Sequence, residues 1–377
     1  MKRFILKGLL AVVLIGGAIE ATARWGLPLL FGSGLAELED YYRPVRRVAE
    51  AEPITHLAVG SSQVAAAIEA DTLESLLRAA KPGQHVRALN VGKGFSQQVQ
   101  HYFGVRNLIE RYPEATRGMT VFLEAPSGVA DFRTWDDQWA LAQWPSLLGP
   151  LLTTRDLPRF WLQADNEFGD KVRATAAHFF YTPRYFRHLR LRMEAAVNRR
   201  LMPPPEDEEE VDLTNAGGIR TDRAGVELTR LEAMRERNER WVEQHGEGGR
   251  DASDWEASIW ADMVRLVRSH GGEVVFFDMP QSPVMQVGGR DQVYRERQDA
   301  FNTWARANDL AILYPRPFLY DETDFPDHLH LRKSRHDEYT TRLAEAYLRW
   351  EQGEPLPDAP PPQDARPGTV DESDEAQ

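Results

Sequence analysis

Five short apolar segments, separated by helical patterns, constrain the fold of this chain more than any other feature of its sequence. The segments have the length and the Val, Ile, Leu and Phe content of buried strands. They span residues 54–59, 86–91, 119–124, 273–279 and 310–314. Amphipathic helical patterns cover residues 71–80, 97–112, 254–270, 292–308 and 334–350. Apolar strands that alternate with helices predict an α/β protein whose parallel five-stranded sheet is covered by helices on both faces.

The interval between the third and fourth segments is far longer than an ordinary connection between parallel strands. We therefore expect residues 125–253 to form a large, mostly helical insertion. The insertion is rich in aromatic residues, including Trp135, Trp139, Phe179, Tyr181 and Tyr185. They could form a lid or a surface on which sugars stack, although aromatic insertions are more often simply packed.

The charge of the chain is concentrated in two segments. The chain has 45 Lys and Arg against 58 Asp and Glu, a net charge of −13. Residues 203–212 and the tail 351–377 account for this whole surplus, and both are rich in proline. Such a composition buries too little apolar surface to fold, so we expect both segments to be disordered. The rest of the chain is balanced in charge and has no basic field for nucleic acid.

The absence of cysteine excludes three classes of protein. With no Cys in the sequence, the chain cannot be a disulfide scaffold, use a cysteine nucleophile or hold a metal through thiolates.

The N-terminus has the pattern of an export signal. Lys2 and Arg3 precede an apolar run that continues to Ile19 with one interruption, Lys7. A basic start followed by an apolar run is typical of a signal peptide, and cleavage near Ala23 would fit. The run is short for a membrane span, but the apolar residues 25–31 could lengthen an uncleaved anchor. Both alternatives place the body outside the cytoplasm.

The residues that follow each strand are the first place to look for a functional site. In an open parallel sheet, ligands bind at the carboxyl ends of the strands. The first strand is followed by Gly60-Ser61-Ser62, a turn that would place Ser62 at a helix N-terminus, where backbone N–H groups can stabilise an oxyanion. By itself, such a turn is more often only a helix cap.

A histidine and an aspartate near the end of the chain supply what a serine nucleophile needs. A serine hydroxyl needs a base, and the base needs an acid that orients it. Asp327 lies three residues before His330 and could hydrogen-bond its ring. A metal site formed by Asp324, Asp327, His328 and His330 is the weaker alternative, because nothing in the sequence completes its ligand shell.

The loop after the second strand contains several glycines. Gly94 could offer a backbone N–H as an oxyanion donor, or it could be an ordinary turn glycine.

Three blocks of sequence together resemble the SGNH (GDSL-like) hydrolase superfamily. They are Gly60-Ser61-Ser62, the loop 90–96, and Asp327 to Leu331 with Tyr339. The sequence VVFFDMPQSP at residues 274–283 is similar to membrane-anchored, extracytoplasmic members that acylate polysaccharides. The resemblance covers about residues 54–128 and 273–350. It implies a three-layer α/β/α domain of the SGNH or flavodoxin-like type.

The resemblance also implies the role of each site residue. Ser62 corresponds to the nucleophile, His330 to the base and Asp327 to the acid, while Ser62 and Gly94 supply oxyanion donors. The chain departs from the pattern in two places. Ser61 replaces an aspartate, and no asparagine follows the third strand to provide a further oxyanion donor.

The predicted organisation follows from these observations. A signal anchor or signal peptide at 1–31 precedes an SGNH-like domain formed by 32–124 and 254–350. The insertion 125–253, with its acidic break at 203–212, divides this domain, and the tail 351–377 ends the chain.

The predicted function is an extracytoplasmic serine esterase or O-acyl(acetyl)transferase. Its substrates would be acyl esters or cell-envelope glycans, with an acyl-enzyme on Ser62, no cofactor and no metal. Its expected partners are the membrane, through the N-terminal segment, and an envelope acylation machinery, and no nucleic acid. The alternative is a weakly active or inactive SGNH-fold scaffold in a polysaccharide assembly.

Overall fold

The computed structural model describes residues 14–22, 42–93, 98–125, 152–163, 168–180, 239, 255–280, 290–315, 324–325 and 330–355. The chain divides into two compact units. The smaller unit comprises Met1–Glu52, Gln97–Ala115 and Phe132–Ala216, and the larger comprises Pro53–Ser96, Thr116–Asp131 and Gly217–Gln377. The acidic segment at 203–212 and nearly all of the tail lie outside the described residues.

The larger unit contains a five-stranded sheet in which every neighbouring pair of strands is parallel. Its strands are β1 (His56–Val59), β2 (Ala88–Asn90), β3 (Thr120–Glu124), β4 (Glu273–Phe277) and β5 (Ala311–Leu313). They lie in the order β2-β1-β3-β4-β5. All five predicted strands are confirmed, each somewhat shorter than its apolar segment. Because the strands are parallel, their carboxyl ends share one edge of the sheet.

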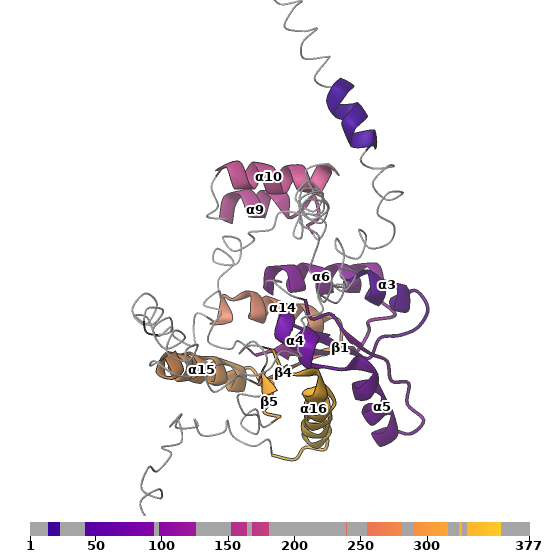
Figure 1. Ribbon diagram of the computed structural model, residues 1–377, viewed down its shortest axis with the longest axis vertical. Helices are drawn as coiled ribbons and strands as arrows, with labels where there is room; N and C mark the ends of the chain where they lie inside the picture. Colours follow the sequence, from indigo (N-terminus) through magenta and orange to yellow (C-terminus); the bar gives the residue numbers. More distant parts are fainter. Residues whose placement is uncertain are drawn as a thin grey trace, which may run out of the picture. The chain divides into compact units, whose positions relative to one another are not determined.

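Different helices pack on side chains that alternate along the strands. Phe277 and Leu313 belong to one core with Leu77 of α5 (Ala70–Ala80) and Tyr347 of α16 (His336–Glu351). Phe276, the neighbour of Phe277 in β4, instead contacts aromatic rings of two other helices. These rings are Trp260 of α14 (Ile259–Ser269) and Phe301 and Trp304 of α15 (Arg290–Ala307). Figure 1 shows β4 between α14 and α16. This burial on both sides explains the unbroken apolar sequence of the strands.

The helix before β4 begins later than its apolar pattern. The pattern predicts a helix from residue 254, whereas α14 begins at Ile259. Ser258 ends the preceding turn, and its Oγ accepts a hydrogen bond from the backbone N of Ala261 at 3.3 Å. A side-chain cap of this kind satisfies an N–H that has no partner within the helix, so the cap determines the boundary.

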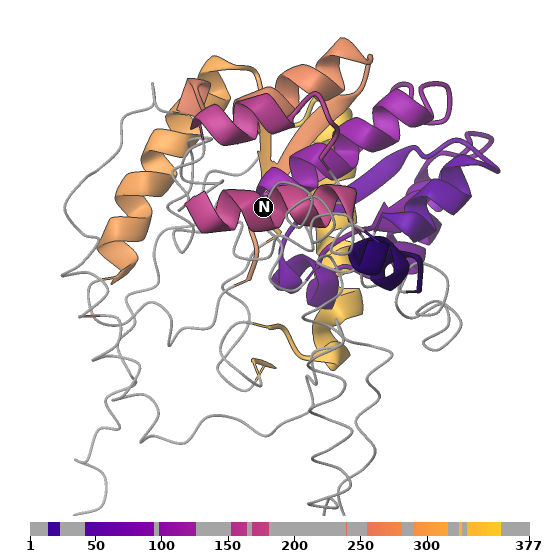
Figure 2. The same ribbon diagram turned by 90° about the horizontal axis from the view of Figure 1, so that it is seen from above.

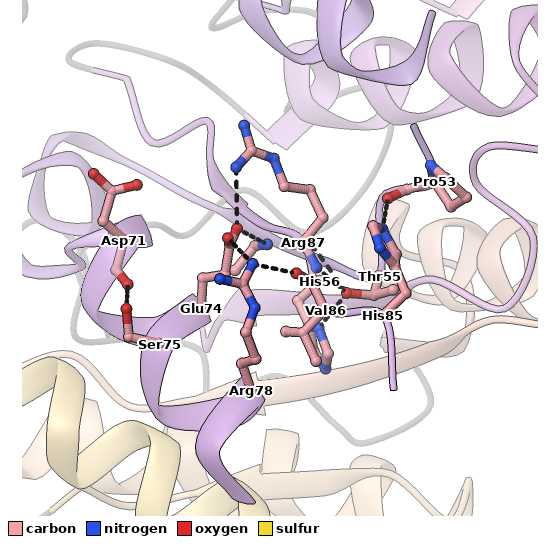
Figure 3. Close-up of polar contacts among 11 residues, drawn as sticks. Pro53, Thr55, His56, Asp71, Glu74, Ser75, Arg78, His85, Val86 and Arg87 are labelled. Carbon is pink, nitrogen blue, oxygen red and sulfur yellow. Dashed lines mark hydrogen bonds and ion pairs between the residues drawn. The ribbon is translucent and has the colours of Figure 1, made fainter. Parts of the chain in front are cut away.

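The amino edge of the sheet contains a buried glutamate. Glu74 of α5 is 7% exposed, and its carboxylate binds Arg78, Arg87 at 3.3 Å, and the backbone N of Ala88 at 3.0 Å. Figure 3 shows Glu74 between the two guanidinium groups. Two cations and one backbone donor thus neutralise this carboxylate and join α5 to the first residue of β2.

Helices form the described part of the smaller unit. Besides the helical residues 14–22, they are α3 (Arg43–Ala49), α6 (Gln98–Arg111), α9 (Leu157–Gln163) and α10 (Phe168–Phe179). The predicted helix at 97–112 is confirmed as α6, whereas α3, α9 and α10 were not among the predicted helices. The helices α9 and α10, drawn in magenta in Figure 2, are joined by a 2.9 Å hydrogen bond from Trp161 Nε1 to Thr175 Oγ1.

The N-terminal segment is described only in part. Residues 14–22 are helical, and Leu14, Ile15 and Ile19 are exposed. Within the described ranges, no helix has both the length and the apolar character that a membrane span needs. The remainder of the predicted signal, residues 1–13 and 23–31, lies outside these ranges.

Candidate active site

The turn between β1 and α4 (Ser62–Ala67) places Ser62 at the carboxyl edge of the sheet. Ser61 is the cap of this helix, since its Oγ accepts a hydrogen bond from the backbone N of Gln63 at 3.1 Å. Ser62 is therefore the first helical residue, and its N–H has no acceptor within the helix. The helix N-terminus adds a partial positive charge at the same point.

His330 lies against Ser62 although 267 residues of sequence separate them, as the 2.7 Å between His330 Nε2 and Ser62 Oγ shows. His330 is 8% exposed and Ser62 is half-buried. The distance is that of a hydrogen bond in which the ring nitrogen can accept the serine proton when Nδ1 carries the ring hydrogen. The structure thus brings together the predicted nucleophile and the predicted base.

Asp324 fixes the chain near His330 from one side. The Arg335 Nε donates to Asp324 Oδ1 at 2.7 Å, and the backbone N of Arg332 donates to the Asp324 carbonyl at 2.7 Å. The Asp324 carboxylate thus has an arginine partner in an ion pair. Among the described residues, no group of three His, Cys, Asp or Glu side chains could hold a metal ion.

His336 fixes the same segment from the start of α16. Its Nε2 donates to the carbonyl of Leu331, the residue next to His330, at 3.0 Å, and its Nδ1 lies 3.1 Å from Glu69 Oε1. His336 was not among the predicted site residues. Its contacts join the histidine-bearing segment to the connection between α4 and α5.

Two of the predicted site residues, Asp327 and Gly94, lie outside the described residues, as does His328. The described chain stops at Lys93, whose backbone N donates to the carbonyl of Gly60 at 3.1 Å. The roles of Asp327 as the acid and Gly94 as an oxyanion donor therefore stay predictions.

Asn90 holds the loop after β2 against α4 through hydrogen bonds of its side chain. Its Nδ2 donates to the carbonyls of Val64 at 3.0 Å and Ile68 at 2.7 Å, and its Oδ1 accepts from the backbone N of Gly92 at 2.7 Å. A Cβ at Gly92 would overlap the backbone N of Ala65, so the loop can approach α4 only with glycine there. These contacts fix the β2 loop against the helix that bears Ser62.

Sequence reasoning missed Glu124, the last residue of β3. Its Oε2 accepts a hydrogen bond from the backbone N of Ser61 at 2.6 Å, and its Oε1 accepts one from Ser61 Oγ at 3.1 Å. A Cβ at Gly60 would overlap the Val64 side chain and lie 2.6 Å from Glu124 Oε2. The glycine is thus required for the carboxylate to reach the turn. A polar residue ending an otherwise apolar buried strand is the signal that could have pointed to it.

Two carboxyl groups at this edge, the buried Glu124 and the half-buried Asp278, have a raised pKa. Burial raises the pKa of Glu124, while the hydrogen bonds from Ser61 and the charge of His330 act in the opposite direction. Burial also raises the pKa of Asp278, the residue after β4, to about 7, and the negative charge of Glu124 adds to this effect. Carboxyl groups with a perturbed pKa are typical of functional sites, and Glu124 is hydrogen-bonded to the turn that bears Ser62.

The arrangement has the parts that nucleophilic acyl transfer needs. Ser62 and His330 lie within hydrogen-bonding distance, and Ser62 begins a helix at the carboxyl edge of a parallel sheet. Comparisons of the sequence with known protein families and with curated proteins found no match. The function must therefore be inferred from these residues.

Proposed function

We propose that the protein is an SGNH-type serine esterase or O-acyl(acetyl)transferase. The observation that carries this proposal is the 2.7 Å contact between Ser62 Oγ and His330 Nε2. A hydroxyl and an imidazole at this distance allow the ring to take the serine proton as the oxygen attacks an ester carbonyl. The proposed first product is an acyl-enzyme on Ser62, with the alcohol released.

In the proposed reaction, His330 accepts the proton of Ser62 and later returns it to the leaving alcohol. Water or a sugar hydroxyl then attacks the acyl-enzyme, with His330 again as the base. The N–H of Ser62 and, by the resemblance, that of Gly94 would bind the oxyanion. Asp327 would orient the histidine. Neither a cofactor nor a metal has a role in this scheme.

The fold is compatible with the proposal. A strand order of β2-β1-β3-β4-β5 with helices contacting alternate side chains is what an SGNH or flavodoxin-like α/β/α domain requires. A serine after β1 and a histidine shortly before the last helix also follow the chain order of the resemblance. We propose an extracytoplasmic location, with the N-terminal segment as signal or anchor, and cell-envelope glycan esters as substrates beside an envelope acylation machinery.

Replacement of Ser62 by alanine tests the proposal. Hydrolysis of 4-nitrophenyl acetate by the full chain should fall by about 1,000-fold or more in Ser62→Ala and in His330→Ala. Ser75→Ala is the matched control, because Ser75 is an exposed serine of α5 whose Oγ binds the Asp71 carbonyl at 2.7 Å. A fluorophosphonate should label the wild type on the peptide that contains Ser62. Undiminished activity and labelling in Ser62→Ala would contradict the proposal.

One observation favours the alternative, a scaffold without activity. The third strand ends in Glu124, an acceptor, where the resemblance leads us to expect a donor for the oxyanion. A scaffold would give no turnover and no fluorophosphonate labelling in the wild type, although the protein is folded.

A further inference from the structure

The carboxylate of Glu124 lies directly behind the nucleophile turn. It makes two hydrogen bonds to Ser61, one with the backbone N and one with the hydroxyl, at 2.6 and 3.1 Å. The residue is 9% exposed. We propose that Glu124 is a positioning residue, which fixes Ser61 so that Ser62 starts α4 in the geometry for attack and which stabilises the imidazolium that His330 becomes. This inference rests on the proposed function.

The proposed role of Glu124 requires its carboxylate form. Burial raises the pKa of Glu124, and the two hydrogen bonds from Ser61 oppose this rise by favouring that form. The Ser61 hydroxyl has one hydrogen, and its oxygen already accepts from the backbone N of Gln63 at 3.1 Å. The hydroxyl hydrogen is donated to Glu124 Oε1, while Oε2 accepts the Ser61 N–H. Both oxygens are acceptors, as in the ionised form, and hydrogen bonds of this kind are stronger than neutral ones.

No Lys or Arg neutralises this carboxylate among the described residues. Its hydrogen bonds come only from Ser61. Two titratable groups are coupled to it: His330 opposes the rise in the pKa of Glu124, and the charge of Glu124 raises the pKa of Asp278. The interaction between two charges is mutual, so a carboxylate that is favoured by a positive His330 also favours that positive charge.

In the proposed reaction, His330 becomes positively charged while Ser62 attacks the ester. The proton moves from Ser62 Oγ to His330 Nε2 as the new C–O bond forms, and the imidazolium persists until that proton passes to the leaving alcohol. A fixed negative charge in a buried site stabilises this step without moving. Glu124 itself neither gains nor loses a proton.

Glu124→Gln separates the charge from the geometry. The amide oxygen can still accept the Ser61 N–H, so the turn is retained while the charge is lost. We expect kcat for 4-nitrophenyl acetate to fall about 100-fold with little change in KM. Because the negative charge is gone, the loss of activity on the acid side of the pH profile should move to lower pH by about one unit.

Glu74→Gln is the matched control. Glu74 is also a buried glutamate that accepts a backbone N–H, but it lies at the amino edge of the sheet (Figure 3). This variant should unfold at a lower temperature, with kcat per folded molecule and the acid side of the pH profile unchanged.

The outcomes distinguish this inference from the proposed function. If Glu124→Gln has the kcat and pH profile of the wild type, or loses activity only in proportion to unfolded protein as Glu74→Gln does, the role of Glu124 is wrong. If Ser62→Ala retains activity in the same assay, the proposed function itself is wrong.

Discussion

The two edges of the sheet each bury a glutamate, but the two glutamates have different partners. At the amino edge, Glu74 binds two arginines and one backbone N–H. At the carboxyl edge, Glu124 binds only the two donors of Ser61 among the described residues. Glu74 is part of an ion-pair network within the fold, whereas Glu124 is bound by the nucleophile turn and interacts electrostatically with a neighbouring histidine. The partners of each carboxylate, rather than its burial, therefore distinguish its role.

A second pair of residues contrasts the same two edges. His56, the first residue of β1, contacts the rings of Phe122 and Tyr347, and its pKa is lowered to about 4, mainly by burial and further by the charge of Lys81. Asp278, just past the end of β4, has its pKa raised to about 7. In the folded state, therefore, His56 is harder to protonate and Asp278 is harder to ionise than in the unfolded state.

The largest effect we predict is an opposite pH dependence of stability from these two residues. The unfolded state protonates His56 below about pH 6.5 and the folded state only near 4, so its contribution is lost as pH falls through this window. The folded state keeps Asp278 protonated up to about pH 7, so its contribution is lost as pH rises from about 4 to 7. At about 1.4 kcal/mol per pKa unit, each residue changes the free energy of unfolding by at most about 3 to 4 kcal/mol across its pH window.

In the wild type, the contributions of His56 and Asp278 to the pH dependence of the free energy of unfolding oppose each other. Single substitutions should reveal each contribution separately. In Asp278→Asn, the free energy of unfolding should rise between pH 4 and 6.5, and in His56→Phe it should fall between pH 4 and 7. Urea denaturation at a series of pH values measures both. Parallel curves for the wild type and both variants would show that these groups do not titrate as described.

The next effect concerns Gly60, at the carboxyl edge of the sheet, where the close packing leaves no room for a side chain. In Gly60→Ala, the new Cβ would overlap Val64 and lie 2.6 Å from Glu124 Oε2, so the turn must shift. We expect about a 100-fold loss of esterase activity, because small displacements of a nucleophile are costly, and a loss of about 1 to 3 kcal/mol in stability.

Gly83 provides the control for this substitution. It has a positive φ of 83°, and, its two chain neighbours apart, no heavy atom of the described residues lies within 4 Å of the position that an alanine methyl group would take. Gly83→Ala should therefore cost only about 1 kcal/mol of backbone strain and no activity. Equal kinetics for the two alanine variants would contradict the tight packing inferred at Gly60.

Controls apart, the smallest effect on activity is expected for a substitution at the amino edge. Glu74→Ala removes an acceptor from Arg78, from Arg87 and from the Ala88 N–H, but Arg78 still reaches the Val86 carbonyl and both arginines reach solvent. We therefore expect a loss of about 2 kcal/mol in stability, less than for a fully buried pair. Thermal unfolding measures this loss, and activity per folded molecule should match that of the wild type. A change in the pH profile of activity would contradict the inference that Glu74 at the amino edge has no influence on the site at the carboxyl edge.

Much of the fold could be predicted because its signals are local. Each strand has an apolar segment, and α5, α6, α15 and α16 have amphipathic patterns close to their observed bounds. The short helix α4 was not predicted as an element with bounds, since six residues hold too little periodicity. Ser62 and His330 were predicted from residue type and chain order, whereas Glu124 was not, because a glutamate at a strand end has many ordinary uses.

The sequence by itself determined the α/β class, the five strands and the chemistry that Ser62 and His330 could perform. These depend on apolar periodicity and on residue type, which are properties of the chain at each position. Only the tertiary structure decided that β1 lies between β2 and β3, that Ser62 and His330 meet, and that Glu124 binds Ser61 while Glu74 binds arginines. The reason is physical: hydrogen bonds and charge interactions act over a few ångströms, and packing alone brings residues that are distant in sequence within that range.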